Sequence, residues 1–169
     1  PFLITRRGVL NSSRMSHALQ MLMTYVGPNS MNMIIAQQGG EIVDVENLPN
    51  DLLFVYPQDG IVTHANHFES PMLRVRDTGK STLPDTIYRS RRLRRLLEAR
   101  RGRLNVETIR EALTDHFSSP DSICRHPDES FPVMDQWMTV ASLILDLTEL
   151  TLRYSEGPAC QGPYHVVRV

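Results

Sequence analysis

Residues 139–154 read TVASLILDLTELTLRY, and this stretch decides the class of fold. The apolar run 139–147 has the length of a strand, and the short polar turn Thr148-Glu149 separates it from a second β-prone run at 151–154. Two such runs joined by a short turn predict a β-hairpin. A further run, 164–169, predicts a third strand after it. This part of the chain is therefore expected to form an antiparallel sheet.

Closer to the N-terminus, the same signals recur. Short runs with strand character occupy residues 30–38, 41–48, 51–56 and 61–68. Gly39-Gly40 and Asp59-Gly60 separate neighbouring runs, and both are pairs that favour tight turns. The sequence therefore predicts a meander of four antiparallel strands.

Three segments have helical patterns instead. Residues 11–25 and 84–101 carry apolar side chains at helical spacing, and Gly-Pro and Gly follow them respectively. Asn105 is expected to cap a third helix, which Pro120 prevents from continuing. Strands in hairpins with helices grouped apart predict an α+β fold, which we expect to be a single domain over 1–169.

Composition narrows the class of protein. The chain has 41% hydrophobic and 22% charged residues and a formal net charge of −1, as expected for a soluble globular protein with no general affinity for nucleic acid. No apolar run is long enough to cross a bilayer, and the residues after Pro1 do not fit a signal peptide. Two cysteines without zinc-type Cys/His spacing predict no metal site and no cofactor, and favour a reducing, cytoplasmic setting.

Three segments go beyond composition and periodicity. They are THANHF at 63–68, DSICRHP at 121–127, and TVASLILDL at 139–147 with GPAC at 157–160. In this order and spacing they resemble the acyl-coenzyme A:6-aminopenicillanic acid acyltransferases, also called isopenicillin N acyltransferases. Bile salt hydrolases and acid ceramidases are more distant relatives of that family. The resemblance covers nearly the whole chain.

The resemblance implies a four-layer αββα fold and a mechanism. In that family, autoproteolysis frees an N-terminal cysteine, whose thiol attacks an amide or thioester while its own α-amine acts as base. Asn66 matches the asparagine that donates a hydrogen bond to the oxyanion. Arg125 matches an arginine near the nucleophile, where a fixed cation favours thiolate over thiol.

The sequence departs from the family at the nucleophile. The family's catalytic cysteine lies upstream of the region that this chain covers, and neither Cys124 nor Cys160 stands at its position. We therefore expect a C-terminal fragment of such an enzyme, which acts on a small amide or thioester substrate and needs an upstream chain with the nucleophile. The alternative is an inactive pseudoenzyme that binds an acyl ligand or a protein and self-associates through unpaired strand edges.

Each candidate residue also has a structural interpretation. Asn66 can be a turn amide that bonds to local backbone, and Arg125 can pair with Asp121 or Asp128. His64 and His67 are expected to be packing or surface histidines, and Cys124 a buried structural residue.

The arginines of 89–103 could bind phosphates of coenzyme A or nucleic acid, but a solvated helix face paired with acidic residues is the preferred interpretation. The methionines of 15–33 are predicted to fill the core.

Overall fold

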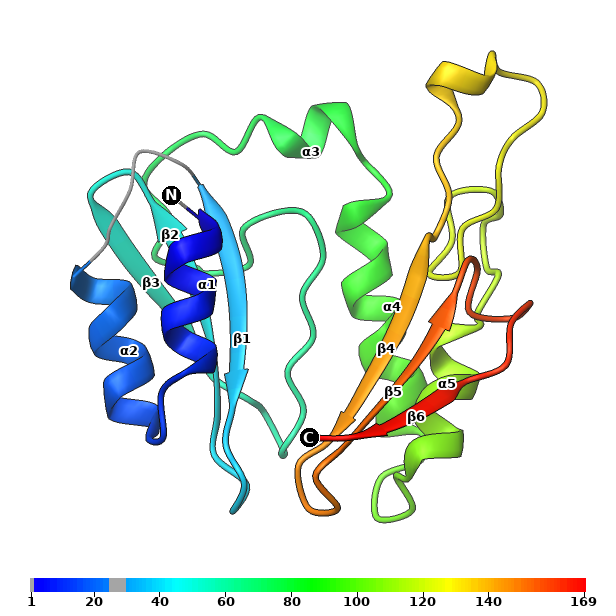
Figure 1. Cartoon of the computed structure of the whole chain (residues 1–169). Helices are drawn as coiled ribbons and strands as arrows, with labels where there is room; N and C mark the ends of the chain where they lie inside the picture. The colour runs from blue at the N-terminus through cyan, green and yellow to red at the C-terminus, as the bar shows by residue number, and fades with distance from the viewer. Residues whose placement is uncertain (1, 25–29) are drawn as a thin grey trace. The chain divides into compact units, whose positions relative to one another are not determined.

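A computed structural model describes residues 2–24 and 30–169, which group into two compact units, residues 1–78 and residues 79–169 (Figure 1). Each unit holds one three-stranded antiparallel sheet together with helices. The prediction of an α+β fold with antiparallel sheets is therefore confirmed.

The first unit contains the predicted meander. Its strands are β1 (Met31–Ala36), β2 (Ile42–Leu48) and β3 (Asp51–Val55), in the order β1-β2-β3. The first hairpin turns at Gly39 and Gly40, whose φ angles of 107° and 102° suit glycine but strain residues with a Cβ. β2 is the central strand, because β1 and β3 both pair with it.

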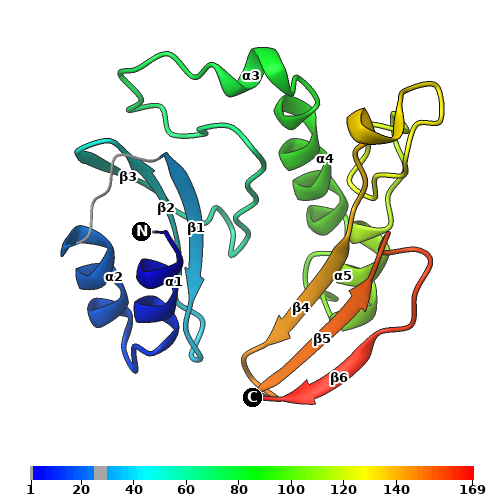
Figure 2. The ribbon, with the colours of Figure 1, turned by 45° about the horizontal axis from the view of Figure 1, so that its top comes forward.

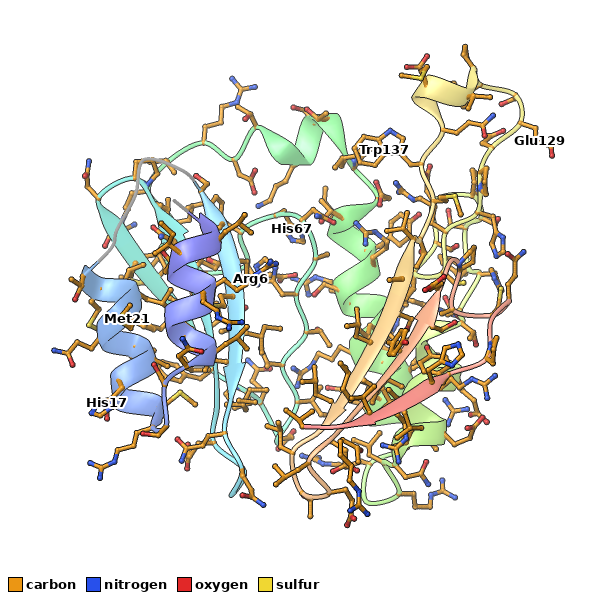
Figure 3. The ribbon with its side chains drawn as sticks, viewed as in Figure 1. Arg6, His17, Met21, His67, Glu129 and Trp137 are labelled. Atoms are coloured by element: carbon orange, nitrogen blue, oxygen red, sulfur yellow. The ribbon has the colours of Figure 1, made fainter. Side chains whose placement is uncertain are left out.

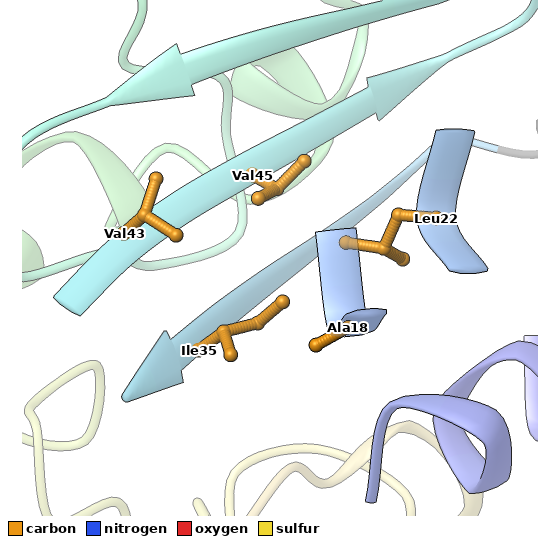
Figure 4. Close-up of a cluster of buried hydrophobic side chains, with 5 residues drawn as sticks. All are labelled: Ala18, Leu22, Ile35, Val43 and Val45. Carbon is orange, nitrogen blue, oxygen red and sulfur yellow. The ribbon is translucent and has the colours of Figure 1, made fainter. Parts of the chain in front are cut away.

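Two helices complete this unit, and one of them covers the sheet. α1 (Phe2–Leu10) packs against α2 (Met15–Thr24), and α2 in turn contacts β1. The buried core between α2 and the sheet consists of Ala18, Leu22, Ile35, Val43 and Val45 (Figure 4). Met15, Met31 and Met33 pack against this cluster, so the prediction of methionines as core filler is confirmed for these three. It is wrong for Met23, whose side chain is 54% exposed.

The prediction for the N-terminal helix needs two corrections. The helix predicted over 11–25 begins only at Met15, because residues 11–14 form a turn after α1; Tyr25 lies outside the described residues. The sequence did not predict α1 at all. Its residues, FLITRRGVL, include a glycine and β-branched side chains, which weaken the helical signal.

The prediction of a fourth strand of the meander, over 61–68, is wrong. The turn at Asp59-Gly60 forms, but only an isolated bridge between Gln58 and Ile61 follows it. The backbone N–H groups of Phe68, Glu69 and Ser70 donate to side-chain carboxylates instead of to a neighbouring strand. Residues 61–78 therefore form a loop.

The second unit combines helices with the predicted C-terminal sheet (Figure 2). Its helices are α3 (Gly79–Thr82), α4 (Thr86–Glu98), α5 (Val106–Leu113) and the 3-10 turn Val133–Asp135. Its strands are β4 (Ala141–Asp146), β5 (Thr151–Glu156) and β6 (His165–Arg168), in the order β4-β5-β6. α5 packs against both α4 and β4.

Local chemistry explains the helices of this unit. The Asn105 side chain accepts from the Thr108 N–H at 2.9 Å, and the Thr108 hydroxyl accepts from the Asn105 N–H at 2.8 Å. This reciprocal cap confirms the predicted start of α5.

The arginine-rich helix α4 is held by ion pairs. They are Arg89–Asp85, Arg92–Asp115, Arg94–Glu98 and, just after the helix, Arg100–Glu111. For these residues the interpretation as a helix face paired with acidic residues is confirmed. Among residues 2–24 and 30–169, no helix has both the length and the apolar character needed to cross a membrane.

Candidate functional site

Two acidic side chains lie buried on one face of the central strand β2. Side chains alternate along a strand, so Val43 and Val45 face the helix side while Asp44 and Glu46 face the other side. Both acidic residues are 0% exposed. A buried carboxylate is costly unless it is paired or neutral, so this face of the sheet requires compensating groups.

His64, from the loop that follows β3, supplies the main compensation. Its Nε2 lies 2.9 Å from Glu46 Oε1 and 4.0 Å from Asp44 Oδ2, and its side chain is 4% exposed. Its Nδ1 lies 2.6 Å from the carbonyl oxygen of Ala65. A carbonyl only accepts, so Nδ1 carries a proton; beside an ionised Glu46, Nε2 carries the other. The geometry therefore describes an imidazolium paired with a buried carboxylate.

The pKa values of the three groups agree with this pairing. Burial opposes the charge on Glu46, but hydrogen bonds from His64 and from two backbone amides together lower its pKa. Burial also opposes the charge on His64, but the bond to Glu46 and the attraction of Asp44 raise its pKa above the ordinary value. Burial raises the pKa of Asp44, more than the nearby His64 lowers it. Glu46 is thus the ionised partner of His64, and burial shifts the pKa of Asp44 in the opposite direction.

Glu46 also fixes the loop in which Asn66 lies. Its Oε1 accepts from the Glu69 N–H as well as from His64, and its Oε2 accepts from the Ser70 N–H at 3.1 Å. One carboxylate therefore binds a side chain before Asn66 and two backbone amides after it. His67, labelled in Figure 3, comes from the same loop, is buried, and lies 3.3 Å from Glu69.

Asn66 itself lies at a bend of this loop and is exposed. On one side of it the His64 side chain bonds to the buried Glu46, and on the other the Phe68 N–H donates to Asp77 Oδ2 at 2.9 Å. The Asn66 side chain is thus presented to solvent from a restrained stretch of backbone.

Asp44, Glu46 and His64 have ligand atoms within 4.8 Å of one another, the spacing of a metal site. The histidine argues against that use. Nδ1 donates to Ala65 and Nε2 bonds to Glu46, so the protonated ring offers no lone pair to a metal. We interpret the cluster as an ion pair.

Arg125 lies in the second unit, where it joins two carboxylates. Its Nη2 is 2.6 Å from Asp85 Oδ2 and 3.1 Å from Asp121 Oδ1, and its side chain is 12% exposed. The pairing with Asp121 that the sequence suggested is confirmed. Asp128 instead accepts from Ser130, at 2.7 Å from the hydroxyl and 3.0 Å from the N–H.

Of the two residues that the sequence singled out, Asn66 belongs to the first compact unit and Arg125 to the second. Sequence reasoning missed Asp44 and Glu46, which organise the loop around Asn66. A signal was present: two acidic residues, two positions apart, lie in the strand expected to be central in the meander.

The two cysteines occupy the second unit together with two histidines. Cys124 is 0% exposed and Cys160 is exposed. Burial raises the pKa of Cys124, so its neutral thiol is favoured. His126 Nε2 lies 3.9 Å from Cys124 Sγ, 3.2 Å from Cys160 Sγ and 3.0 Å from His116 Nε2. This group of side chains was not indicated by spacing along the chain.

Comparison with known proteins identifies a family. The model of a family described as acyl-coenzyme A:6-aminopenicillanic acid acyl-transferase matches residues 1–158. A search of curated proteins finds no significant match. The matched range includes THANHF, DSICRHP and TVASLILDL, so the resemblance noted from these segments is confirmed.

Proposed function

The chain belongs to the acyl-coenzyme A:6-aminopenicillanic acid acyl-transferase family, and from this premise we propose that it is the C-terminal part of a cysteine N-terminal-nucleophile amidohydrolase or acyltransferase. Such an enzyme breaks the bond between an acyl group and an amine or a thiol. A small amide or an acyl thioester is the substrate class that the family description favours. The two sheets described above would then belong to a four-layer αββα fold.

The observation that carries the proposal is the way Glu46 fixes the Asn66 loop. His64 on one side of Asn66, and the Glu69 and Ser70 amides on the other, all bond to the Glu46 carboxylate. Catalysis by oxyanion stabilisation needs a donor that is already aimed when charge develops. We assign that role to the exposed Asn66 side chain, which lies on this restrained bend.

The reaction follows from these groups and from a cysteine thiolate. The thiolate attacks the acyl carbon, the carbonyl π electrons move to the oxygen, and Asn66 donates to the resulting oxyanion. Collapse of the tetrahedral intermediate expels the amine or thiolate, which takes up a proton, and leaves an acyl-enzyme. Water or an acceptor amine then attacks the acyl-enzyme and releases the cysteine.

Arg125 would contribute a fixed positive charge. Asp85 and Asp121 hold its guanidinium in place, and Asp85 also pairs with Arg89 at 2.6 Å. Two carboxylates close to Arg125 reduce the field that it exerts at a distance. We therefore give Arg125 a positioning and electrostatic role that is smaller than the role of Asn66.

The nucleophile, in this proposal, lies outside the 169 residues. Cys124 is buried and its thiol form is favoured, while Cys160 lies within hydrogen-bonding reach of His126 inside a turn. Neither has an α-amine of its own to act as base. A cysteine at a new chain terminus, brought by a preceding segment or a partner chain, would supply both groups.

Native mass spectrometry of the protein isolated from the cells that make it, through an affinity tag after Val169, tests the proposal. We expect a second, cysteine-initiated chain in the complex, and turnover of a panel of acyl amides and acyl-coenzyme A thioesters. Asn66→Ala should lower kcat by about 10²–10³-fold, while His17→Gln, on an exposed face of α2, should leave it unchanged.

The opposite result supports the pseudoenzyme. If the 19.3 kDa chain occurs alone or only as multiples of itself, and no substrate in the panel is turned over, the catalytic proposal is wrong. A ligand- or protein-binding role would then be the better interpretation.

A further inference from the structure

We propose that His116, Cys124, His126 and Cys160 bind one Zn²⁺ ion, with two sulfur and two nitrogen ligands. Nothing in the acyl-transfer proposal uses these four side chains, and the sequence spacing did not indicate them. The inference therefore stands or falls separately from the proposed function.

The distances between the four ligand atoms fit a tetrahedral site. All four lie within 4.8 Å of one another. His126 Nε2 is 3.0 Å from His116 Nε2, 3.2 Å from Cys160 Sγ and 3.9 Å from Cys124 Sγ. A tetrahedron with zinc–nitrogen distances of ~2.0 Å and zinc–sulfur distances of ~2.3 Å separates its ligand atoms by roughly 3.3–3.8 Å. The three distances from His126 Nε2 depart from these values by only a few tenths of an ångström.

The donor set selects the metal. Two thiolates and two imidazoles in a tetrahedral arrangement favour zinc over magnesium or calcium, which prefer oxygen ligands. Four protein ligands also leave no open position for a substrate, so a structural ion is expected. As each cysteine sulfur binds the ion, its thiol proton passes to solvent, and two protons are released per zinc.

Hydrogen bonds hold the segment with Cys124 and His126 before any ion binds. The Cys124 N–H donates to the Asp115 carbonyl at 3.0 Å, which ties it to the residue just before His116. Arg125 N–H donates to Thr139 Oγ1 at 2.9 Å, and Thr139 N–H donates back to the Arg125 carbonyl at 3.0 Å. Three of the four ligands are thus placed by a fixed backbone, as a preorganised metal site requires.

Hydrogen bonds of the Asp115 carboxylate restrain the backbone around His116. Arg92 holds the Asp115 carboxylate with two bonds, of 3.1 Å from Nε and 2.7 Å from Nη2. The same carboxylate accepts from the Phe117 N–H at 3.2 Å. The residues on both sides of His116 are therefore restrained, although the His116 side chain is exposed.

Cys160 completes the group from a turn after β5. Gly157 N–H donates to the Val140 carbonyl at 2.8 Å, and Gln161 N–H donates to the Pro158 carbonyl at 2.9 Å. Cys160 and His116 also line a surface cavity of about 350 Å³. An ion from solvent therefore has a path to the two exposed ligands.

The ion would have a consequence for the neighbouring residue. Arg125 lies between two of the ligands, Cys124 and His126, so zinc would fix the segment that presents it. It would also link α5 to the turn after β5, because His116 follows the helix and Cys160 follows the strand.

Zinc content is the direct test. The full chain, purified under reducing conditions, should retain one equivalent of Zn²⁺ by elemental mass spectrometry, and should recover it from Zn²⁺ alone in competition with a chromogenic chelator. Cys160→Ser and His116→Gln, which change the two exposed ligands, should each weaken zinc binding by about 100-fold or more. His17→Gln, an exposed histidine on α2 (Figure 3), is the matched control and should bind like wild type.

Cobalt gives a second readout that does not depend on activity. Co²⁺ bound in place of zinc should show tetrahedral visible bands and thiolate-to-metal charge transfer, and Cys160→Ser should weaken the charge transfer. A circular dichroism spectrum like that of wild type would show that the variants remain folded.

Two results would overturn the proposal. One is less than stoichiometric zinc, or zinc that binds equally to wild type, Cys160→Ser and His116→Gln. The other is a Cys124–Cys160 disulfide in protein isolated without reductant, seen as the loss of two hydrogens from the intact mass. Neither result would bear on the nucleophile or on Asn66.

Discussion

Glu46 is one side chain on which much of the first unit depends. Its carboxylate compensates the charge of His64 and accepts the amides of Glu69 and Ser70, all at a site that is 0% exposed. A shorter acidic residue at this position would bond less well to these three partners. An apolar residue would leave the buried His64 cation unpaired.

We expect Glu46→Gln to lower the free energy of unfolding by about 3–5 kcal/mol, because it leaves the buried His64 charge without its partner. Urea unfolding followed by circular dichroism measures this. Glu41→Gln removes an exposed carboxylate just before β2 and should change stability by no more than about 0.5 kcal/mol. If the pair matters, the double variant Glu46→Gln/His64→Gln should cost less than the sum of its two single changes; strict additivity would contradict the pairing.

The raised pKa of His64 gives a pH dependence with a definite sign. The fold favours the protonated ring, so this contribution is fully present below the ordinary pKa of 6.5 and is lost as pH rises through the folded value above it. We expect wild type to lose stability above pH 6.5 and His64→Gln to lack that loss, as measured by urea midpoints across a pH series. Identical alkaline limbs would contradict the assignment.

The acidic limb combines two opposed groups. The lowered pKa of Glu46 gives stability that is present above 4.5 and lost as pH falls through its folded value. The raised pKa of Asp44 acts in the other direction, since its contribution is present below 3.8 and is lost as pH rises through its folded value. The alkaline limb is therefore the cleaner test.

At the scale of elements, the sequence predicted correctly those turns and helix ends that a single residue or residue pair determines. Gly39-Gly40 and Asn105 each fix a backbone position by themselves, and both the first hairpin and the start of α5 are confirmed. Residues 61–68 have the composition of a strand, but the Phe68 amide donates to Asp77, and the amides of Glu69 and Ser70 just after it donate to Glu46. The pattern of residues 61–68 does not indicate these hydrogen bonds, because the accepting carboxylates lie elsewhere in the chain.

α2 offers a test of the packing that its spacing predicted. Leu22 is 1% exposed in the core, whereas its neighbour Met23 is 54% exposed. We expect Leu22→Ala to lower the free energy of unfolding by about 2–5 kcal/mol through lost contacts and a cavity. Met23→Ala should cost no more than about 0.5 kcal/mol, and equal costs in urea titrations would contradict the orientation of α2.

At the scale of the whole molecule, the sequence predicted some residues of the candidate site and missed others. Asn66 and Arg125 came from the family resemblance, and the structure gives each a restrained setting within its own unit. Asp44, Glu46 and the Cys/His group were missed because each depends on loops that bring distant positions together. Spacing along a chain does not record a contact such as the one between His126 and Cys160, 34 residues apart.

The second unit also exposes apolar surface beside its strand edges. Leu143 and Leu145, on β4, are 56% and 60% exposed, and β4 is an edge strand of its sheet. We expect the 169-residue chain by itself to self-associate as its concentration rises, and Leu143→Lys with Leu145→Lys to reduce this. Sedimentation velocity measures this self-association, and Thr148→Lys in the adjoining turn is the control for adding a lysine outside the apolar surface. A wild-type chain that stays monomeric at all concentrations would contradict the prediction.

The attachment of the Asn66 loop to Glu46 has a consequence for isotope exchange. Amides in a loop without strand partners normally exchange their hydrogen for deuterium within a short time. Here the amides of Phe68, Glu69 and Ser70 each donate to a carboxylate. They should form an island of slow exchange outside any helix or strand, and protonation of Glu46 in acid should open the Glu69 and Ser70 amides together. The loop around Asn66 would thus share the lifetime of the sheet beneath it.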